Sequence, residues 1–208
     1  MYLGAKLWRM ALNNGVVAWE MSPSKYSRDA DINCAKNVKD NFPGKYILPA
    51  RAENPFVMDY GLVMNTTNAL DPAEASYFQS IIGIIRWIVE IGRIDIATEV
   101  SVISSHLAYP QERHLEAAFY AMAYLKQKHN SRLVFDPTYP KIDESIFTDY
   151  DWKYFYGDAK EAIPPNSPAP CGKGVDLRAK VDSDYAGDKV TRRSRTGYSI
   201  FCNMSLVY

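Results

Sequence analysis

Asp182 and Asp184 are the side chains whose type and spacing could support chemistry. They lie two positions apart in a stretch, residues 175–185, in which apolar and polar residues alternate as in a β-strand. Alternate residues of a strand share a face, so both carboxylates would point the same way. Paired carboxylates on a rigid strand can hold divalent cations such as magnesium for phosphoryl chemistry. A solvated strand face running into a turn explains the same residues, and spacing alone favours that simpler interpretation.

A dense basic cluster follows this predicted strand and precedes a second one at residues 197–204. Its members are Lys189, Arg192, Arg193 and Arg195. Cations in a hairpin loop can neutralise the phosphates of a nucleic-acid backbone. A solvated loop is again the simpler account of the cluster alone.

The three histidines do not suggest a metal centre. His106 and His114 lie eight residues apart across Pro110, and His129 is further on, so no set has the spacing of zinc ligands. We interpret them as hydrogen-bonded histidines of a helical segment. The sequence also lacks a phosphate loop, a dinucleotide fingerprint and a Ser-His-Asp grouping.

The elements that position these residues begin with a predicted three-helix core at about 71–129. Asp71-Pro72-Ala73-Glu74 is a helix start with capping-box spacing, and we expect a second start at Asp95 and a third at Pro110. Apolar residues recur at spacings of three and four in each helix. They are Tyr77, Ile81, Ile84, Ile85, Ile88, then Ile96, Val100, Ile103, Leu107, then Leu115, Phe119, Met122 and Leu125.

Residues 2–21 predict a β-hairpin around Asn13-Asn14-Gly15, because those residues tolerate the positive φ of a tight turn. A helix should follow, with Ser22 as N-cap and Pro23 at its first position. A short strand is expected at 131–135, and then an irregular, acidic and aromatic region with a proline run at 163–170. Strands and helices in separate blocks indicate an α+β chain.

Composition limits the class of protein. The 208 residues carry 24 basic and 24 acidic side chains, so the formal net charge is zero and nucleic-acid binding would need a local patch. Cys34, Cys171 and Cys202 are too few and too far apart for a disulfide framework, and we expect three small buried side chains. No stretch is long and apolar enough for a membrane span or a signal peptide, so we expect the cytoplasm or nucleus and no membrane partner.

Four blocks resemble copia-type retrotransposon polyproteins, and they follow that family's order. The second block, Tyr77-Phe78-Gln79-Ser80-Ile81-Ile82-Gly83-Ile84-Ile85-Arg86-Trp87 with Gly92-Arg93-Ile94-Asp95-Ile96-Ala97, is similar to the family's Y-x-S-L-I-G-x-L-x-Y and R-P-D-I. His114-Leu115-Glu116-Ala117 and Tyr124-Leu125-Lys126 are similar to H-W-x-A and Y-L-K. Val181-Asp182-Ser183-Asp184-Tyr185-Ala186-Gly187 with Arg192-Arg193-Ser194-Arg195-Thr196-Gly197-Tyr198 resembles the opening of the ribonuclease H domain. The first block, Tyr2-Leu3-Gly4, resembles the strand that follows the polymerase active-site hairpin in that family.

The resemblance implies three regions. Residues 1–135 would be the end of the reverse transcriptase palm with thumb-like and connecting helices, 136–174 a linker, and 175–208 the N-terminal hairpin of a truncated ribonuclease H-like domain. By position, Asp182 matches the first metal-binding aspartate of the nuclease, and Asp184 a recurrent residue that is not a core ligand. The expected partners are an RNA–DNA hybrid or duplex nucleic acid and the rest of the polyprotein of this transposable element.

The same resemblance implies a catalytically incomplete chain, and we leave open whether it is an enzyme. The aromatic-x-Asp-Asp polymerase motif and the later nuclease carboxylates are absent from the sequence. The full-length family uses Mg²⁺, but we expect Asp182 alone to form only an incomplete site without tight binding, because two-metal chemistry needs several converging carboxylates.

Two non-catalytic functions remain as alternatives. In a nucleic-acid-binding module, cations along the first helix would contact a duplex backbone; these are Lys25, Arg28, Lys36 and Lys39. In a protein-interaction scaffold, the aromatic residues of 136–174 would bind another protein. An exposed apolar patch in that region would distinguish the scaffold.

Overall fold

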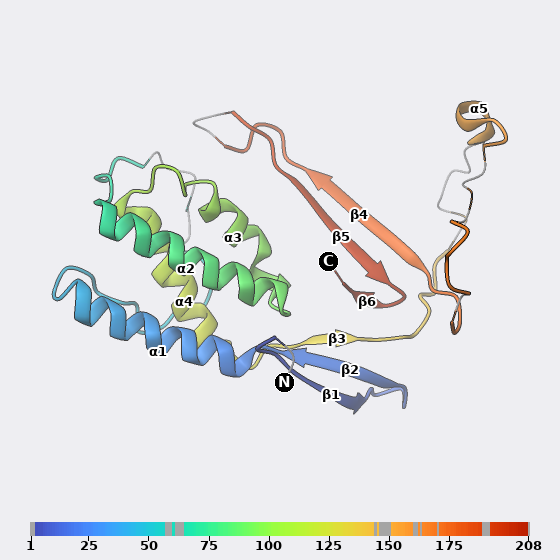
Figure 1. Ribbon diagram of the computed structural model, residues 1–208, viewed down its shortest axis with the longest axis horizontal. Coiled ribbons are helices and arrows are strands. Elements are labelled where there is room, and N and C mark those ends of the chain that lie inside the picture. Colours follow the sequence, from blue (N-terminus) through green and yellow to red (C-terminus); the bar gives the residue numbers. More distant parts are fainter. Residues whose placement is uncertain are drawn as a thin grey trace.

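The computed structural model describes residues 3–56, 60, 65–143, 145, 151–159, 162, 164–169, 171–188 and 192–207. Within them the chain is α+β, with a group of packed helices and two antiparallel three-stranded sheets (Figure 1). In chain order the elements are β1 (Lys6–Ala11), β2 (Val17–Ser22), α1 (Ser24–Asn41), α2 (Pro72–Glu90), the 3₁₀ turn η1 (Ile94–Ile96), α3 (Ala97–Ser104), α4 (Glu112–Gln127), β3 (Leu133–Phe135), α5 (Lys153–Tyr156), β4 (Leu177–Ser183), β5 (Thr196–Cys202) and β6 (Ser205–Leu206).

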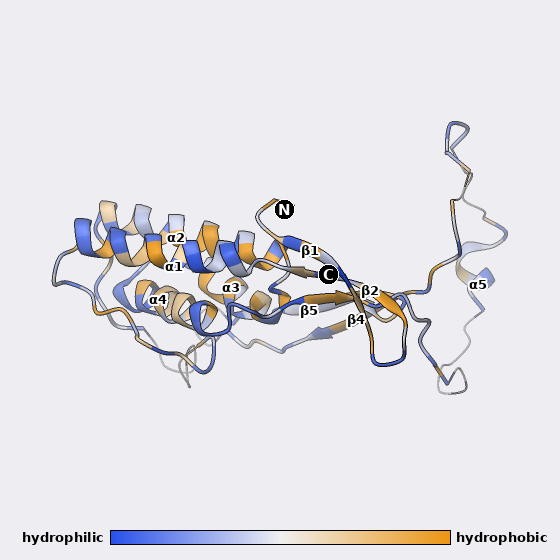
Figure 2. Ribbon diagram, turned by 90° about the horizontal axis from the view of Figure 1, so that it is seen from below, coloured by the Kyte–Doolittle hydropathy of each residue, from blue (hydrophilic) through white to orange (hydrophobic). Residues whose placement is uncertain are grey.

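The helical core contains four helices where three were expected. Helices α2, α3 and α4 pack together as predicted, and α1 joins them by contacting both α2 and α4. Its buried contribution is Ala30, Cys34 and Val38. The hydropathy colouring in Figure 2 shows hydrophobic and hydrophilic residues on each of the long helices, as an amphipathic pattern requires. The predicted stripes of α2 and α4 are confirmed, although α2 also buries Phe78 and Ile82.

Two of the expected helix starts differ from the structure. Asp71 does cap α2, accepting bonds from the backbone N–H groups of Ala73 and Glu74. Asp95, however, lies inside η1, and its carboxylate accepts two 2.8 Å bonds from Arg93 instead of capping a helix. Pro110 precedes α4 without opening it, and Gln111 is the N-cap.

The N-terminal hairpin is confirmed, with Lys6 opposite Ser22 and Ala11 opposite Val17. The predicted strand at 131–135 becomes β3 and pairs with β2, which completes a sheet of order β1-β2-β3. Ser22 was expected to cap α1, but Pro23 occupies the N-cap position. The Ser22 hydroxyl instead donates to the carbonyl of Ser131 at 2.9 Å, which ties β2 to the segment before β3.

The C-terminal hairpin is confirmed and gains a third strand. β4 pairs with β5 over seven residues, and β6 adds to β5, so the sheet order is β4-β5-β6. The turn between β5 and β6 is bonded to the chain that leaves β3. Ser205 Oγ donates to the Asp136 carbonyl at 2.8 Å, and Met204 N–H donates to the Thr138 carbonyl at 3.0 Å. The two sheets are therefore joined directly.

The described residues of the region 136–174 are largely irregular, as predicted, and include the short helix α5. The expectation of three buried cysteines is wrong. Cys34 is buried in the core, whereas Cys171 is exposed and Cys202 is half-buried. Among the described residues, no helix is long and apolar enough to cross a membrane.

Candidate functional site

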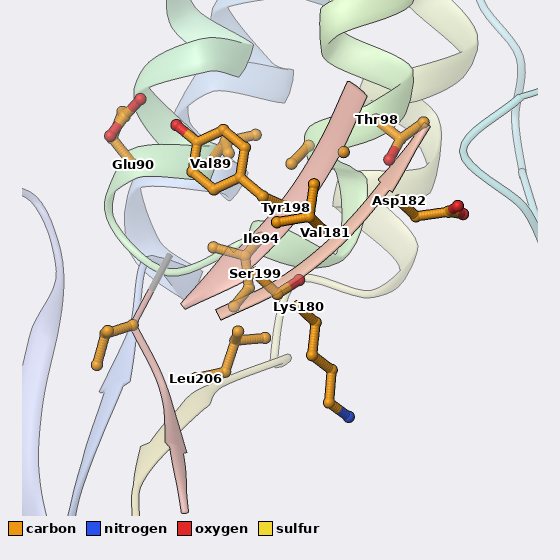
Figure 3. A pocket seen from close by; sticks show the side chains of 13 residues that line it. Val89, Glu90, Ile94, Thr98, Lys180, Val181, Asp182, Tyr198, Ser199 and Leu206 are labelled. Carbon is orange, nitrogen blue, oxygen red and sulfur yellow. The ribbon is translucent and has the colours of Figure 1, made fainter. Parts of the chain in front are cut away.

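Asp182 lies near the end of β4, opposite Gly197 of β5. It borders a cavity of about 430 Å³ between the C-terminal sheet and the helical core. The helical wall comes from the end of α2 and the start of α3, and the sheet wall from β4, β5 and β6 (Figure 3). The lining residues are Val89, Glu90, Ile94, Ala97, Thr98, Lys180, Val181, Asp182, Gly197, Tyr198, Ser199, Leu206 and Val207.

The cavity does not gather a set of metal ligands around Asp182. In Figure 3, Tyr198 and Val181 lie toward Val89 of α2, and the Asp182 carboxylate points away from them. Across the parts of the chain that the structure describes, no three His, Cys, Asp or Glu side chains come together to hold a metal ion. A lone carboxylate does not fit a two-metal centre, and we assign no chemical step to magnesium. The metal-binding role of Asp182 stays a prediction.

Asp184 has a structural role in the loop that joins β4 to β5. Its backbone N–H donates to the Arg195 carbonyl at 3.0 Å, and its carboxylate accepts the backbone N–H of Arg195. A Cβ added at Gly187 would lie 2.7 Å from Asp184 Cγ, so only glycine leaves room for this carboxylate. The turn interpretation of Asp184 is therefore the one that the structure supports.

The basic cluster lies on this same loop. Lys189 falls outside the described residues, so nothing is said of its position. Arg192 and Arg193 are exposed, and Arg195 is half-buried. The loop backbone is held by bonds from Arg192 N–H to the Asp188 carbonyl and from Asp188 N–H to the Arg193 carbonyl, at 2.8 and 3.2 Å. These two bonds hold the backbone that carries the exposed side chains of Arg192 and Arg193.

The loop lies beside a pair of stacked histidines that sequence reasoning missed. The rings of His106 and His114 are 3.9 Å apart and within 11° of parallel. Burial lowers the pKa of His106, while Asp188 in the loop raises it and Arg195 lowers it. The stacking depends on how the turn after α3 returns the chain to α4. No periodicity or spacing in the sequence could have predicted it.

His114 is a buried helix cap, in agreement with the interpretation that it is a hydrogen-bonded histidine. The Gln111 N–H donates to its Nδ1 at 3.0 Å, and the Asn65 side-chain amide lies 3.0 Å from Nε2. Burial, with the charges of His106 and Arg113 added, lowers the pKa of His114 to about 4. The ring is therefore neutral at pH 7.

A second basic surface lies on α1. Its four cations are all exposed and fall within roughly 80° of arc around the helix. They are Lys25, Arg28, Lys36 and Lys39. Lys25 also pairs with Asp29 at 3.5 Å. The stripe is about 21 Å long, which is long enough to meet several phosphates of a duplex.

Compared with protein-family models, curated proteins and solved structures, the chain matches none of them. Function therefore has to be argued from the residues and their geometry.

Proposed function

We propose that this chain is part of a copia-type reverse transcriptase–ribonuclease H polyprotein, and that it contacts an RNA–DNA hybrid or another nucleic-acid duplex without complete catalytic machinery of its own. The sequence contains no adjacent Asp-Asp pair, which polymerase chemistry of that family requires. The proposed contribution of this chain is to hold duplex, with the β4–β5 loop against the phosphates.

The observation that carries the proposal is that blocks resembling the family contact one another although they are far apart in sequence. Arg93 is fully buried, and it pairs with Asp95 two residues on. Its guanidinium also donates to the Lys128 carbonyl at 3.0 Å and lies 5.6 Å from the ring of Tyr124. Tyr124 in turn reaches Asp95 through its hydroxyl. The second and third blocks thus meet in one polar cluster around the buried Arg93.

The first block contacts the second, and the fourth block is held together by its own contacts. Trp87, in the second block, donates its indole N–H to the Leu3 carbonyl of the first at 3.3 Å. In the fourth block, Gly187 leaves room for the Asp184 carboxylate, which accepts the backbone N–H of Arg195. The support for the proposal is that the first three blocks contact one another through Arg93, Tyr124 and Trp87, all of which belong to those blocks.

A binding assay tests the proposal. Anisotropy of a labelled RNA–DNA hybrid, measured over a salt series, should give log K falling linearly with log salt. Arg192→Gln with Arg193→Gln should reduce the magnitude of that slope by about 2, because two phosphate contacts are lost. The matched control replaces two helix cations, Lys36→Gln with Lys39→Gln, and should leave the slope unchanged. Weak binding with a flat salt response would overturn the proposal.

A cleavage assay tests the catalytic part. We expect no cleavage of the hybrid in magnesium by the full chain. Clear cleavage that Asp182→Asn abolishes would show that other metal ligands join Asp182, which the present geometry lacks. The chain would then be a working nuclease.

The α1 stripe favours one second candidate, a nucleic-acid-binding module that grips duplex through this helix. The same binding assay distinguishes the two. If Lys36→Gln with Lys39→Gln lowers the slope while the loop variant does not, the helix makes the contacts and the β4–β5 loop is a solvated turn.

A further inference from the structure

β4 is an edge strand with an open side. It pairs with β5 alone, and Figure 1 shows its other side facing away from β6 and β3. The bond from Asp184 N–H to the Arg195 carbonyl fixes which backbone groups point inward. By alternation, even-numbered residues of β4 bond toward β5, and Leu177, Ala179, Val181 and Ser183 direct their N–H and C=O groups outward. No described residue bonds to those outward groups. Such an edge is a template for another strand.

The charges on β4 are self-complementary about Val181. Arg178 and Lys180 precede Val181 and Asp182 follows it on one face of β4, and Asp184 comes just after the strand in the same alternation. If a second β4 pairs antiparallel around a two-fold axis at Val181, Lys180 lies opposite Asp182 of the second copy. Arg178 then lies opposite Asp184 of the second copy. Each of these four charged residues is then opposite one of the other sign.

Neighbouring registers do not have this property. A two-fold axis at Lys180 places that lysine opposite itself. An axis at Ala179 places Lys180 opposite Arg178 and Asp182 opposite Asp176. The outward backbone groups allow all three registers, because each pairs odd-numbered residues. Like charges directly opposite each other are destabilising, so charge selects the register centred on Val181.

The residues at the centre are available for this pairing. Neither Lys180 nor Asp182 forms an ion pair with a described residue. On the opposite face Val181 and Leu177 are 68% and 69% exposed, and Tyr185 is 93% exposed. The same register brings Val181 against its own copy and Leu177 against Tyr185 of the second copy, which would cover this apolar surface. Arg178 already pairs with Asp176, and the Asp184 carboxylate already accepts the Arg195 N–H, so the central Lys180–Asp182 pairs determine the register.

We propose that the partner of β4 is a second copy of this chain, bound antiparallel with the two-fold axis at Val181, so that two three-stranded sheets join into one sheet of six strands. The interface is isologous, with each residue and its opposite exchanging places between the copies. This proposal is independent of nucleic-acid binding, because its test measures the molecular mass of the chain in solution and uses no nucleic acid.

Sedimentation equilibrium of the full chain over a concentration series tests the proposal. The wild-type chain should show a monomer–dimer equilibrium. Lys180→Asp alone, or Asp182→Lys alone, should raise the dimer dissociation constant at least about tenfold, because each change turns two attractive pairs into repulsive ones. The double variant Lys180→Asp with Asp182→Lys should restore the dimer, since Asp and Lys then face each other with their places exchanged.

A backbone variant checks the strand pairing itself. Val181→Pro removes an N–H that faces the open edge and should abolish the dimer, whereas Val181→Thr keeps that N–H and should retain it. Circular dichroism establishes that each variant is folded. A wild-type chain that stays monomeric throughout, a dimer indifferent to Lys180→Asp, or a double variant that fails to recover would each overturn the proposal.

Discussion

Glu74 and His114 are buried polar side chains that close the N-termini of two helices. The Glu74 carboxylate accepts the Asp71 N–H at 3.1 Å and the Tyr46 hydroxyl at 2.6 Å, and it pairs with Lys45. Burial raises the pKa of Glu74, but these three partners lower it below its ordinary value. His114 makes the equivalent closure for α4 through Gln111. Both helices thus depend on a side chain keeping one protonation state.

We predict that His114 makes stability depend on pH. Its folded-state pKa of about 4 lies below the ordinary value of 6.5, so the unfolded chain binds the proton more tightly. The contribution of neutral His114 to the free energy of unfolding is therefore fully present above about pH 6.5. It is lost as the pH falls toward 4, which lowers that free energy by about 2–3 kcal/mol. Urea unfolding at pH 7, 6, 5 and 4 measures the loss.

The matched variant is His114→Gln, because glutamine at this position can still accept the N-cap N–H but does not titrate. The difference between the two unfolding series should therefore grow as the pH falls. His129→Gln, in the turn after α4, serves as the control and should follow the wild-type chain. If the free energies of unfolding of the wild-type chain and His114→Gln changed in parallel with pH, the pKa of His114 would not be lowered in the folded state.

Residues whose partners are near in sequence could be predicted, and others could not. The capping box of Asp71 and Glu74 spans three positions, so local spacing reveals it. Asp95 was also expected to start a helix, but its carboxylate pairs with Arg93, whose buried guanidinium is also bonded to the Lys128 carbonyl. A bond across 35 residues has no local signal, and an isolated buried charge is too costly to leave unpaired.

At the scale of elements, the β4–β5 loop is held by the fit between Gly187 and Asp184. We predict that Gly187→Ala displaces the Asp184 carboxylate, because the added Cβ would lie 2.7 Å from Asp184 Cγ. The Arg195 N–H then loses its acceptor. Hydrogen exchange at the Arg195 amide should be faster by about fivefold, as expected when a hydrogen bond of about 1 kcal/mol is lost.

A double variant isolates the cause. In an Asp184→Ala background the carboxylate is gone, so Gly187→Ala should have no further effect on exchange at Arg195. An additional acceleration there would mean that Gly187 is needed for backbone conformation and not for space.

Element types followed from the sequence more reliably than element ends. Alternation and helical periodicity predicted both hairpins and the core helices, because those patterns reflect the buried face directly. α1 was expected to begin one residue earlier than it does, since the Ser22 hydroxyl bonds to Ser131 in place of the helix. The two residues of β6 are too few to show any period, and their strand conformation depends on pairing with β5.

At the scale of the whole molecule, Asn203 connects the two sheets. It is 7% exposed, and its backbone φ is 53°, a conformation that asparagine tolerates. Its side-chain amide donates to the Pro137 carbonyl at 3.0 Å, and its side-chain oxygen accepts the Asp176 N–H at 2.9 Å. We predict that Asn203→Ala destabilises the chain by about 2 kcal/mol, from lost hydrogen bonds and an unfavourable φ. Urea unfolding measures this loss.

Asn203→Gly separates those two causes, because glycine accepts the positive φ but lacks the amide. It should recover about 1 kcal/mol relative to alanine and leave the remainder of the loss. Limited proteolysis should then cut both variants faster than wild type after residue 136. Equal stability of all three chains would show that the two sheets are held together without Asn203.

The α+β class could be predicted because separate blocks of strand and helix patterns are visible in the sequence. The joining of the sheets could not, since the bonds at Asn203 span 66 and 27 residues. For the candidate site, too, local features could be predicted and contacts between distant segments could not. Asp182 on its strand and the arginines on their loop were placed correctly, whereas the cavity wall from α2 and α3 comes from tertiary packing alone.

The two ends of the segment 139–174 lie next to each other. The Tyr139 hydroxyl donates to the Gly174 carbonyl, and the residues just outside both ends meet at Asn203. Closing a loop costs little more when the loop is longer, so the number of residues in this segment can change without moving either end. This segment is therefore a suitable insertion site: a tag or a whole inserted domain could be placed there while the bonds between the two sheets are kept.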